Sequence, residues 1–109
     1  MEPTPRTAKE YLTADRKRPF HEWLVRRLDG STRAQIALRI RRIAETGNYG
    51  DCGPVGEGVF ELLFMSKGPG CRVYFGIDGD LVILLIGGDK STQQSDIRKA
   101  KAYWSDYNA

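Results

Sequence analysis

A lysine follows two glycines directly after an apolar run near the end of the sequence. The run is Leu81–Ile86, and the residues after it read Gly-Gly-Asp-Lys-Ser-Thr. A glycine pair lets the backbone turn sharply and approach a ligand closely, and Ser91 or Thr92 is suited to cap a following helix. Because a cation beside a helix N-terminus can receive phosphate, the pattern predicts a phosphate site at Lys90. A well-capped turn between a strand and a helix would give the same pattern.

An arginine and a tyrosine alternate with apolar residues on a second predicted strand. The side that we expect to face the core carries Cys71, Val73, Phe75 and Ile77. Arg72 and Tyr74 then project together on the concave or solvent face, level with the end of the neighbouring strand that carries Lys90. Arginine binds phosphate through its planar fork and tyrosine stacks on bases, so the pair indicates a site for a phosphate and a base. A solvated arginine on a strand is the simpler alternative.

Hydrophobic periodicity predicts three helices and three main strands. Helices are predicted over residues 19–29, from Ser31 or Thr32 to Gly47, and over residues 93–107. Strands are predicted over 59–66, 71–78 and 81–86, the last buried on both faces, with a weaker strand over 8–12 and a bend at 66–70. Because the links between the main strands are too short for crossovers, these strands should form an antiparallel meander. The predicted class is α+β, with two N-terminal helices packed on a curled antiparallel sheet and a C-terminal helix.

The composition is that of one ordinary folded domain. The chain has 109 residues, of which 40% are hydrophobic and 28% charged, as in globular proteins. We expect residues 1–6 to form a flexible tail and residues 7–109 a single domain. No apolar run is long enough to span a bilayer or to act as a signal peptide. Cys52 and Cys71 have neither the spacing of a disulfide scaffold nor that of a zinc site, so the expected location is the reducing cytoplasm.

Positive charge is concentrated between residues 16 and 42. This block holds nine Lys and Arg residues against two carboxylates, an excess of seven positive charges in a chain whose net charge is +3. Such an excess attracts polyanions or an acidic partner, and we assign Arg41 and Arg42 within it to RNA contact. The alternative is that solvated arginines cover the outer faces of two helices.

An ordered set of short motifs resembles one toxin family. The motifs are Gly56–Leu62, Gly68–Phe75, Leu84–Gln93 with Asp96, Ile97 and Ala100, and also Phe20, Trp23, Leu24, Leu28, Gly47–Asp51 and Trp104. In order and spacing they resemble the phage-derived addiction module killer protein group, which is HigB-like and belongs to the RelE/ParE toxin superfamily. The resemblance implies a compact RelE-like fold.

The resemblance also implies the toxin of a type II toxin–antitoxin system. RelE-like toxins enter the ribosomal A site with the concave face of the sheet and cleave messenger RNA there, which inhibits translation. The implied endoribonuclease reaction needs no metal and no cofactor, because the ribose 2′-hydroxyl attacks the adjacent phosphate. The implied partners are a helix-turn-helix, HigA-like antitoxin and the ribosome with its messenger RNA. Operator DNA would be bound only through the antitoxin, and no membrane is involved.

Motif position assigns roles to a few residues. By resemblance, Arg72 stabilises the charge of the transition state and Lys90 binds phosphate, while Tyr74 stacks or orients a base. The general base would come from Glu61, Asp89 or Asp96.

The sequence also departs from the family pattern. Leu63 stands where the group commonly has arginine, Cys71 replaces an aromatic residue, and Asp96 stands where RelE has a tyrosine on its last helix. These departures leave two alternatives open. One is a ParE-like toxin that acts on DNA gyrase without cutting RNA, and the other is a degenerate toxin that acts as a co-repressor with its antitoxin.

Overall fold

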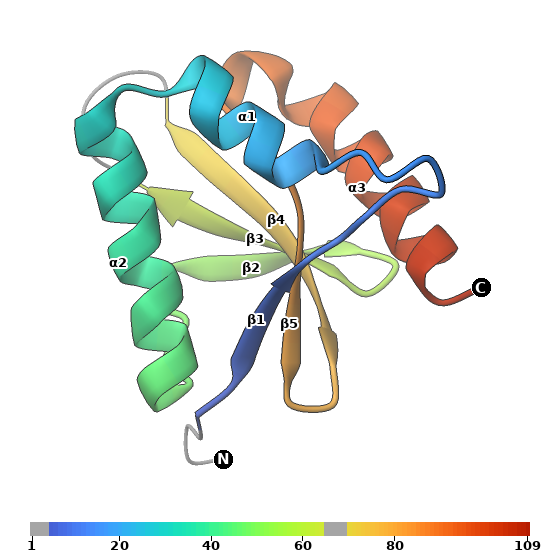
Figure 1. The fold of residues 1–109 in the computed structure, drawn as a ribbon, viewed down its shortest axis with the longest axis horizontal. Helices are drawn as coiled ribbons and strands as arrows, with labels where there is room; N and C mark the ends of the chain where they lie inside the picture. Colours follow the sequence, from blue (N-terminus) through green and yellow to red (C-terminus); the bar gives the residue numbers. More distant parts are fainter. Residues whose placement is uncertain (1–4, 65–69) are drawn as a thin grey trace.

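The computed structural model describes residues 5–64 and 70–109. In these residues the elements follow one another as β1 (Thr7–Glu10), α1 (Pro19–Arg27), α2 (Gly30–Thr46), β2 (Cys52–Gly56), β3 (Val59–Phe64), β4 (Cys71–Asp78), β5 (Leu81–Gly88), the 3-10 turn η1 (Lys90–Thr92) and α3 (Gln93–Tyr107). A twisted sheet lies at the centre, and the helices surround it (Figure 1). Four residues of the predicted bend at 66–70 and the first four residues of the predicted tail lie outside the described residues.

The sheet is mixed, with its strands in the order β1-β5-β4-β3-β2. Strand β1 runs parallel to β5, with Thr7 opposite Leu81 and Glu10 opposite Leu84. The other neighbouring pairs are antiparallel. The prediction of a RelE-like α+β fold, with two N-terminal helices on an antiparallel meander, is therefore wrong. A strand comes first, and α1 and α2 lie between it and the rest of the sheet.

The physical reason for this error lies in the connections. The argument from short links holds for β3, β4 and β5, which do form a meander. It does not apply to β1, because two helices and the rest of the sheet separate β1 from β5, and so long a connection permits a parallel pair. Strand β2 was not predicted at all. Its sequence, Cys-Gly-Pro-Val-Gly, contains residues that usually argue against a strand. These residues are tolerated because β2 lies at the edge of the sheet, where its one strand neighbour within the described residues is β3.

Helices cover both faces of the sheet and create two cores. On one face, α1 and α2 contribute Phe20, Ile36 and Ile43, which pack against Val73 and Phe75 of β4. On the other face, α3 contributes Ala100, with Ile97 and Trp104, against Val59, Tyr74 and Ile83. Strand β5 sends Val82 and Leu84 to the first core and Ile83 and Leu85 to the second, so its predicted burial on both faces is confirmed.

The predicted helix boundaries are close to those observed. α3 spans the predicted residues, and α2 ends where Gly47 adopts the left-handed conformation with φ 73° and donates its N–H to the Ile43 carbonyl. The N-cap of α2 is Asp29, whose carboxylate accepts from the Thr32 N–H at 2.8 Å, and not Ser31 or Thr32. Asp29 is an equally good N-cap residue, so sequence alone did not separate these positions.

Candidate functional site

Gly87 and Gly88 are the last two residues of β5 and do not form a turn. A β-carbon on Gly87 would lie 2.2 Å from Cζ3 of Trp23 in α1, and one on Gly88 would lie 1.8 Å from Oδ2 of Asp96 in α3. Both glycines are therefore needed because helices on opposite faces of the sheet approach the strand closely. The interpretation of this pair as a sharp turn is therefore wrong.

The link from β5 to α3 is capped by Asp89. Its carboxylate accepts from the Ser91 N–H at 2.8 Å and from the Ser91 hydroxyl at 2.5 Å, and a capping box joins it to Thr92. The hydrogen bond from the Ser91 hydroxyl is the main reason why the pKa of Asp89 lies below its ordinary value. The Thr92 hydroxyl instead donates to buried Asp96 at 2.5 Å. Asp89 and Asp96 are thus fixed to the start of α3, and this arrangement supports a structural role better than that of a general base.

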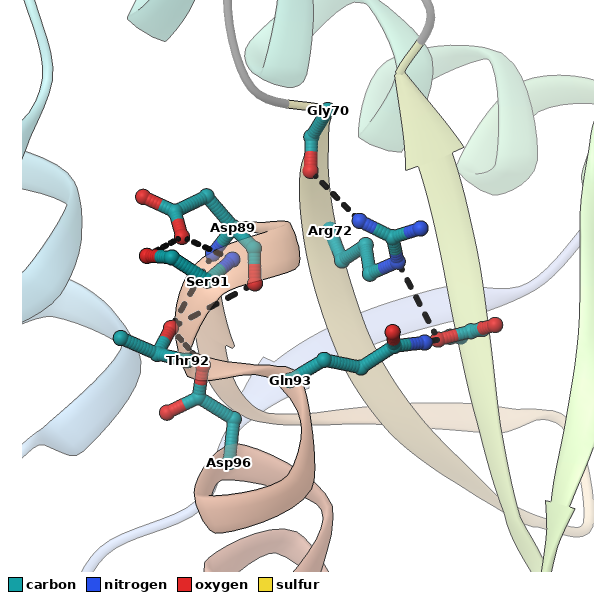
Figure 2. Close-up of polar contacts among 8 residues, drawn as sticks. Gly70, Arg72, Asp89, Ser91, Thr92, Gln93 and Asp96 are labelled. Carbon is teal, nitrogen blue, oxygen red and sulfur yellow. Dashed lines mark hydrogen bonds and ion pairs between the residues drawn. The ribbon is translucent and has the colours of Figure 1, made fainter.

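Arg72 lies at the start of β4 with only 14% of its side chain exposed. Its Nη1 donates to the Gly70 carbonyl at 2.8 Å, and its Nε is 3.6 Å from Oε2 of Glu61 on β3. The same Glu61 oxygen accepts from Nε2 of Gln93 at 3.3 Å. Figure 2 shows the guanidinium and the Gln93 amide on one side of the start of α3, with Asp89, Ser91, Thr92 and Asp96 on the other. Three elements therefore meet around one cation and one carboxylate.

Tyr74 is fully buried, with 0% of its surface exposed. It stands opposite Glu61 in the sheet, and within the described chain its hydroxyl has no hydrogen-bond partner. Burial, followed by the charge of Glu61, raises the pKa of Tyr74 far above its ordinary value. The alternation that places Arg72 and Tyr74 on one face is confirmed, but the expectation that Tyr74 faces a solvent-filled concavity is wrong. α3 covers that face, so Tyr74 has no ring surface available to a base.

Lys90 and the arginines of α2 are placed differently relative to Arg72. Lys90 is exposed and follows Gly88 by two residues. Because Gly88 pairs with Arg72 across the sheet, Lys90 and Arg72 lie at the same end of the sheet. Arg41 and Arg42 are exposed on α2, the helix whose core lies on the face opposite α3. Arg41 is also 3.3 Å from Glu45. The structure therefore brings together Arg72, Glu61 and Tyr74 and separates them from Arg41 and Arg42.

Gln93 is the functional candidate that sequence reasoning missed. It is the first residue of α3 and contacts Glu61, 32 positions earlier in the chain. In the sequence it ends the Leu84–Gln93 motif and stands at the predicted helix start, three residues after Lys90, but neither position indicates a contact with Glu61. Chemically, Gln93 and Arg72 hold the Glu61 carboxylate in one orientation, and a fixed orientation is what a general base needs in order to reach its proton. The buried guanidinium beside it can stabilise negative charge that develops on a nearby group.

Two further properties concern the described residues as a set. Within residues 5–64 and 70–109, no three His, Cys, Asp or Glu side chains gather in a way that could hold a metal ion. The helices in this part of the chain are too short or too polar to cross a membrane.

Comparison with known proteins places the chain in a family without assigning it an activity. No protein-family model matches the chain. It is 47% identical over 83 residues to a protein of Haemophilus influenzae described only as uncharacterized, and the alignment covers 75% of this chain and 82% of that protein. The chain therefore belongs to the same family as that Haemophilus protein.

Proposed function

We propose that this chain is the toxin of a type II toxin–antitoxin pair and acts in the cytoplasm as a ribosome-dependent, metal-independent messenger RNA endonuclease. The observation that carries the proposal is the Arg72–Glu61 pair, a cation and a carboxylate 3.6 Å apart at one end of the sheet. The motif resemblance described above supports the same activity. In this proposal the partner that neutralises the toxin is a helix-turn-helix antitoxin.

The reaction proposed for this pair is attack by a ribose 2′-hydroxyl on the adjacent phosphorus. Glu61 takes the proton of the 2′-hydroxyl, and the bond from phosphorus to the 5′ oxygen breaks while the new bond to the 2′ oxygen forms. Water donates a proton to the 5′ oxygen, and the hydroxide that remains takes the proton from Glu61, which restores the carboxylate and leaves a cyclic phosphate and a free 5′-hydroxyl. Arg72 stabilises the negative charge on the phosphorane oxygens, and exposed Lys90 binds the phosphate backbone.

In this proposal Tyr74 has a structural role next to the site. Because Tyr74 is fully buried and stands opposite Glu61 in the sheet, it packs beside that residue and does not touch the RNA. Asp96 accepts a hydrogen bond from the Thr92 hydroxyl and has a structural role at the start of α3. Arg41 and Arg42 are not part of this site.

The test is to express the chain in bacteria and to measure protein synthesis together with the positions of messenger RNA breaks. Wild type should arrest synthesis and leave 5′-hydroxyl ends at A-site codons. Arg72→Ala and Glu61→Gln should each reduce cleavage by about two to three orders of magnitude, as the loss of a well-placed stabilising group does. Arg98→Ala, which removes an exposed arginine of α3, is the matched control and should stay active.

Two outcomes would contradict the proposal. Inhibition of DNA supercoiling with protein synthesis intact would indicate a gyrase-directed toxin. Normal growth, together with tight binding to a helix-turn-helix partner, would indicate a co-repressor that has lost its toxic activity.

A further inference from the structure

A groove of about 530 Å³ opens between α1 and α3 beside the end of β5. The two helices lie next to each other at this end of the sheet (Figure 1). β1 pairs with β5 only as far as Leu84, whereas β4 pairs with β5 as far as Gly88. Among the described residues, the last four of β5 therefore have a strand neighbour on one side only. Three of these four, Ile86, Gly87 and Gly88, line the groove.

Cationic side chains line both walls of the groove. Arg26 and Arg27 line it from α1, and Lys99 lines it from α3. All three are exposed. Across the part of the chain that the structure describes, none of them forms an ion pair within 4 Å. Their charge is thus available to an anion that lies between the helices.

Negative charge has a different position in the same groove. Asp89 and Asp96 line it where β5 leads into α3, and both are held by Ser91 or Thr92. Glu22 adds a third carboxylate from α1, so formal charges in the lining balance. The fitting ligand therefore carries an anionic group for the cations of the walls and N–H donors for the carboxylates. Trp23 and Tyr103 add aromatic surface beside these polar groups.

We infer that this groove binds one nucleotide of a single-stranded RNA, with its phosphates on Arg26, Arg27 and Lys99 and the donor edge of its base toward the carboxylates. The volume falls within the range of small-ligand pockets, about 300–1,000 Å³. An extended peptide fits less well, because the pairing of β5 shifts register within the free segment, after Leu84. The inference extends the proposed function, since it takes the strand in the groove to be the RNA that Arg72 acts on.

The experiment is fluorescence anisotropy of a short labelled single-stranded RNA, titrated with the full chain at several salt concentrations. Arg26→Ala combined with Arg27→Ala should weaken binding by at least about tenfold. It should also make the salt dependence shallower by about 1.4 in log–log slope, as expected for two phosphate contacts to a single strand. Lys99→Ala should make it shallower by about 0.7.

The matched control is one residue away from Lys99. Arg98→Ala removes the same charge from an exposed position of α3 that does not line the groove, and it should leave both affinity and slope unchanged. Equal losses in Arg98→Ala and Lys99→Ala would overturn the inference, since they would indicate general electrostatic attraction. A loss confined to Arg41→Ala with Arg42→Ala would also overturn it, because it would place the strand on α2.

Trp23 provides an independent readout inside the groove. The chain has two tryptophans, so Trp104→Phe leaves Trp23 as the single reporter. RNA should change its fluorescence, and a free nucleotide such as GMP should bind far more weakly than the RNA. Equal binding of GMP would identify a free nucleotide as the ligand and would overturn the assignment to an RNA strand.

Cleavage separates this inference from the proposed function. If the groove variants lose RNA binding while wild type never cuts RNA, the groove assignment stands and the nuclease proposal fails. If Arg26→Ala with Arg27→Ala and Lys99→Ala all cut RNA at the wild-type rate and bind it normally, the groove assignment fails and the nuclease proposal stands.

Discussion

Replacing Gly87 with alanine should destabilise the fold through a collision with Trp23. Three ring carbons of Trp23 would lie 2.2–2.5 Å from the new methyl group, whereas carbon atoms in contact are normally about 3.5–4.0 Å apart. The ring also lies against Phe20, with ring centroids 6.0 Å apart, which limits its movement on that side. Overpacking a core costs about 1–3 kcal/mol, and three close contacts favour the upper end.

Part of this cost is offset by alanine itself. In a strand interior alanine is better than glycine by roughly 0.5–1 kcal/mol, because it restricts the unfolded backbone. The net loss should therefore be about 2 kcal/mol, which corresponds to a fall in Tm of roughly 10 °C for a domain of this size.

The assay is urea unfolding of Gly87→Ala, followed by circular dichroism. Gly53→Ala is the matched control, because Gly53 is also a strand glycine but has no heavy atom within 4 Å of the added methyl group. With no collision to offset the gain from alanine, its free energy of unfolding should rise by roughly 0.5–1 kcal/mol. Replacing the Trp23 ring with the smaller leucine side chain (Trp23→Leu) in the Gly87→Ala background should recover part of the lost unfolding free energy. If Gly87→Ala is as stable as wild type but loses only its effect on RNA, the packing argument is refuted and the glycine serves a ligand.

Two other predictions concern groups with shifted pKa values. Burial and the hydrogen bond to Asp106 raise the pKa of Tyr11 from 10.0 to about 12. The folded state holds this proton more tightly than the unfolded chain does. The stabilisation is therefore complete below pH 10 and is lost as the pH rises toward 12. Tyr11→Phe should flatten the fall in unfolding free energy measured over that window. Asp89→Ala should cost about 1 kcal/mol through loss of the cap. The carboxylate has a lowered pKa, so this difference from wild type should be full above pH 3.8 and shrink as the pH falls below it in urea titrations; a constant difference down to pH 2 would contradict the role of the charge.

Local pattern was sufficient to predict most of the elements. Apolar residues at helical spacing gave α1, α2 and α3 within about two residues, and Gly47 marked the end of α2 because it adopts a positive φ. The predicted strands at 71–78 and 81–86 are joined by a tight turn in which Gly79 has a φ of 60°. These features depend on residues that are neighbours in the chain, which is why sequence alone contains them.

The features that were missed depend on distant residues. No pattern of neighbouring residues indicates the parallel pairing of Thr7 with Leu81. Without that pairing the sequence predicts a purely antiparallel sheet. The burial of Tyr74 follows from α3 folding over the sheet, and a strand pattern does not say what covers its second face. The contact of Gln93 with Glu61 joins a helix start to a strand 32 positions earlier. Arg72 was placed correctly because alternation along one strand decides its face.

The place of β1 in the sheet has a consequence for how the chain is synthesised. Arg6 donates to the carbonyl of Gly79, 73 positions later, and the strand after it needs residues 81–84 as its only partner. During translation β1 therefore lacks this partner until residues 81–84 have left the ribosome. The β1–β5 pair is thus a contact of high sequence separation, and such contacts slow folding because a long loop must close before they form.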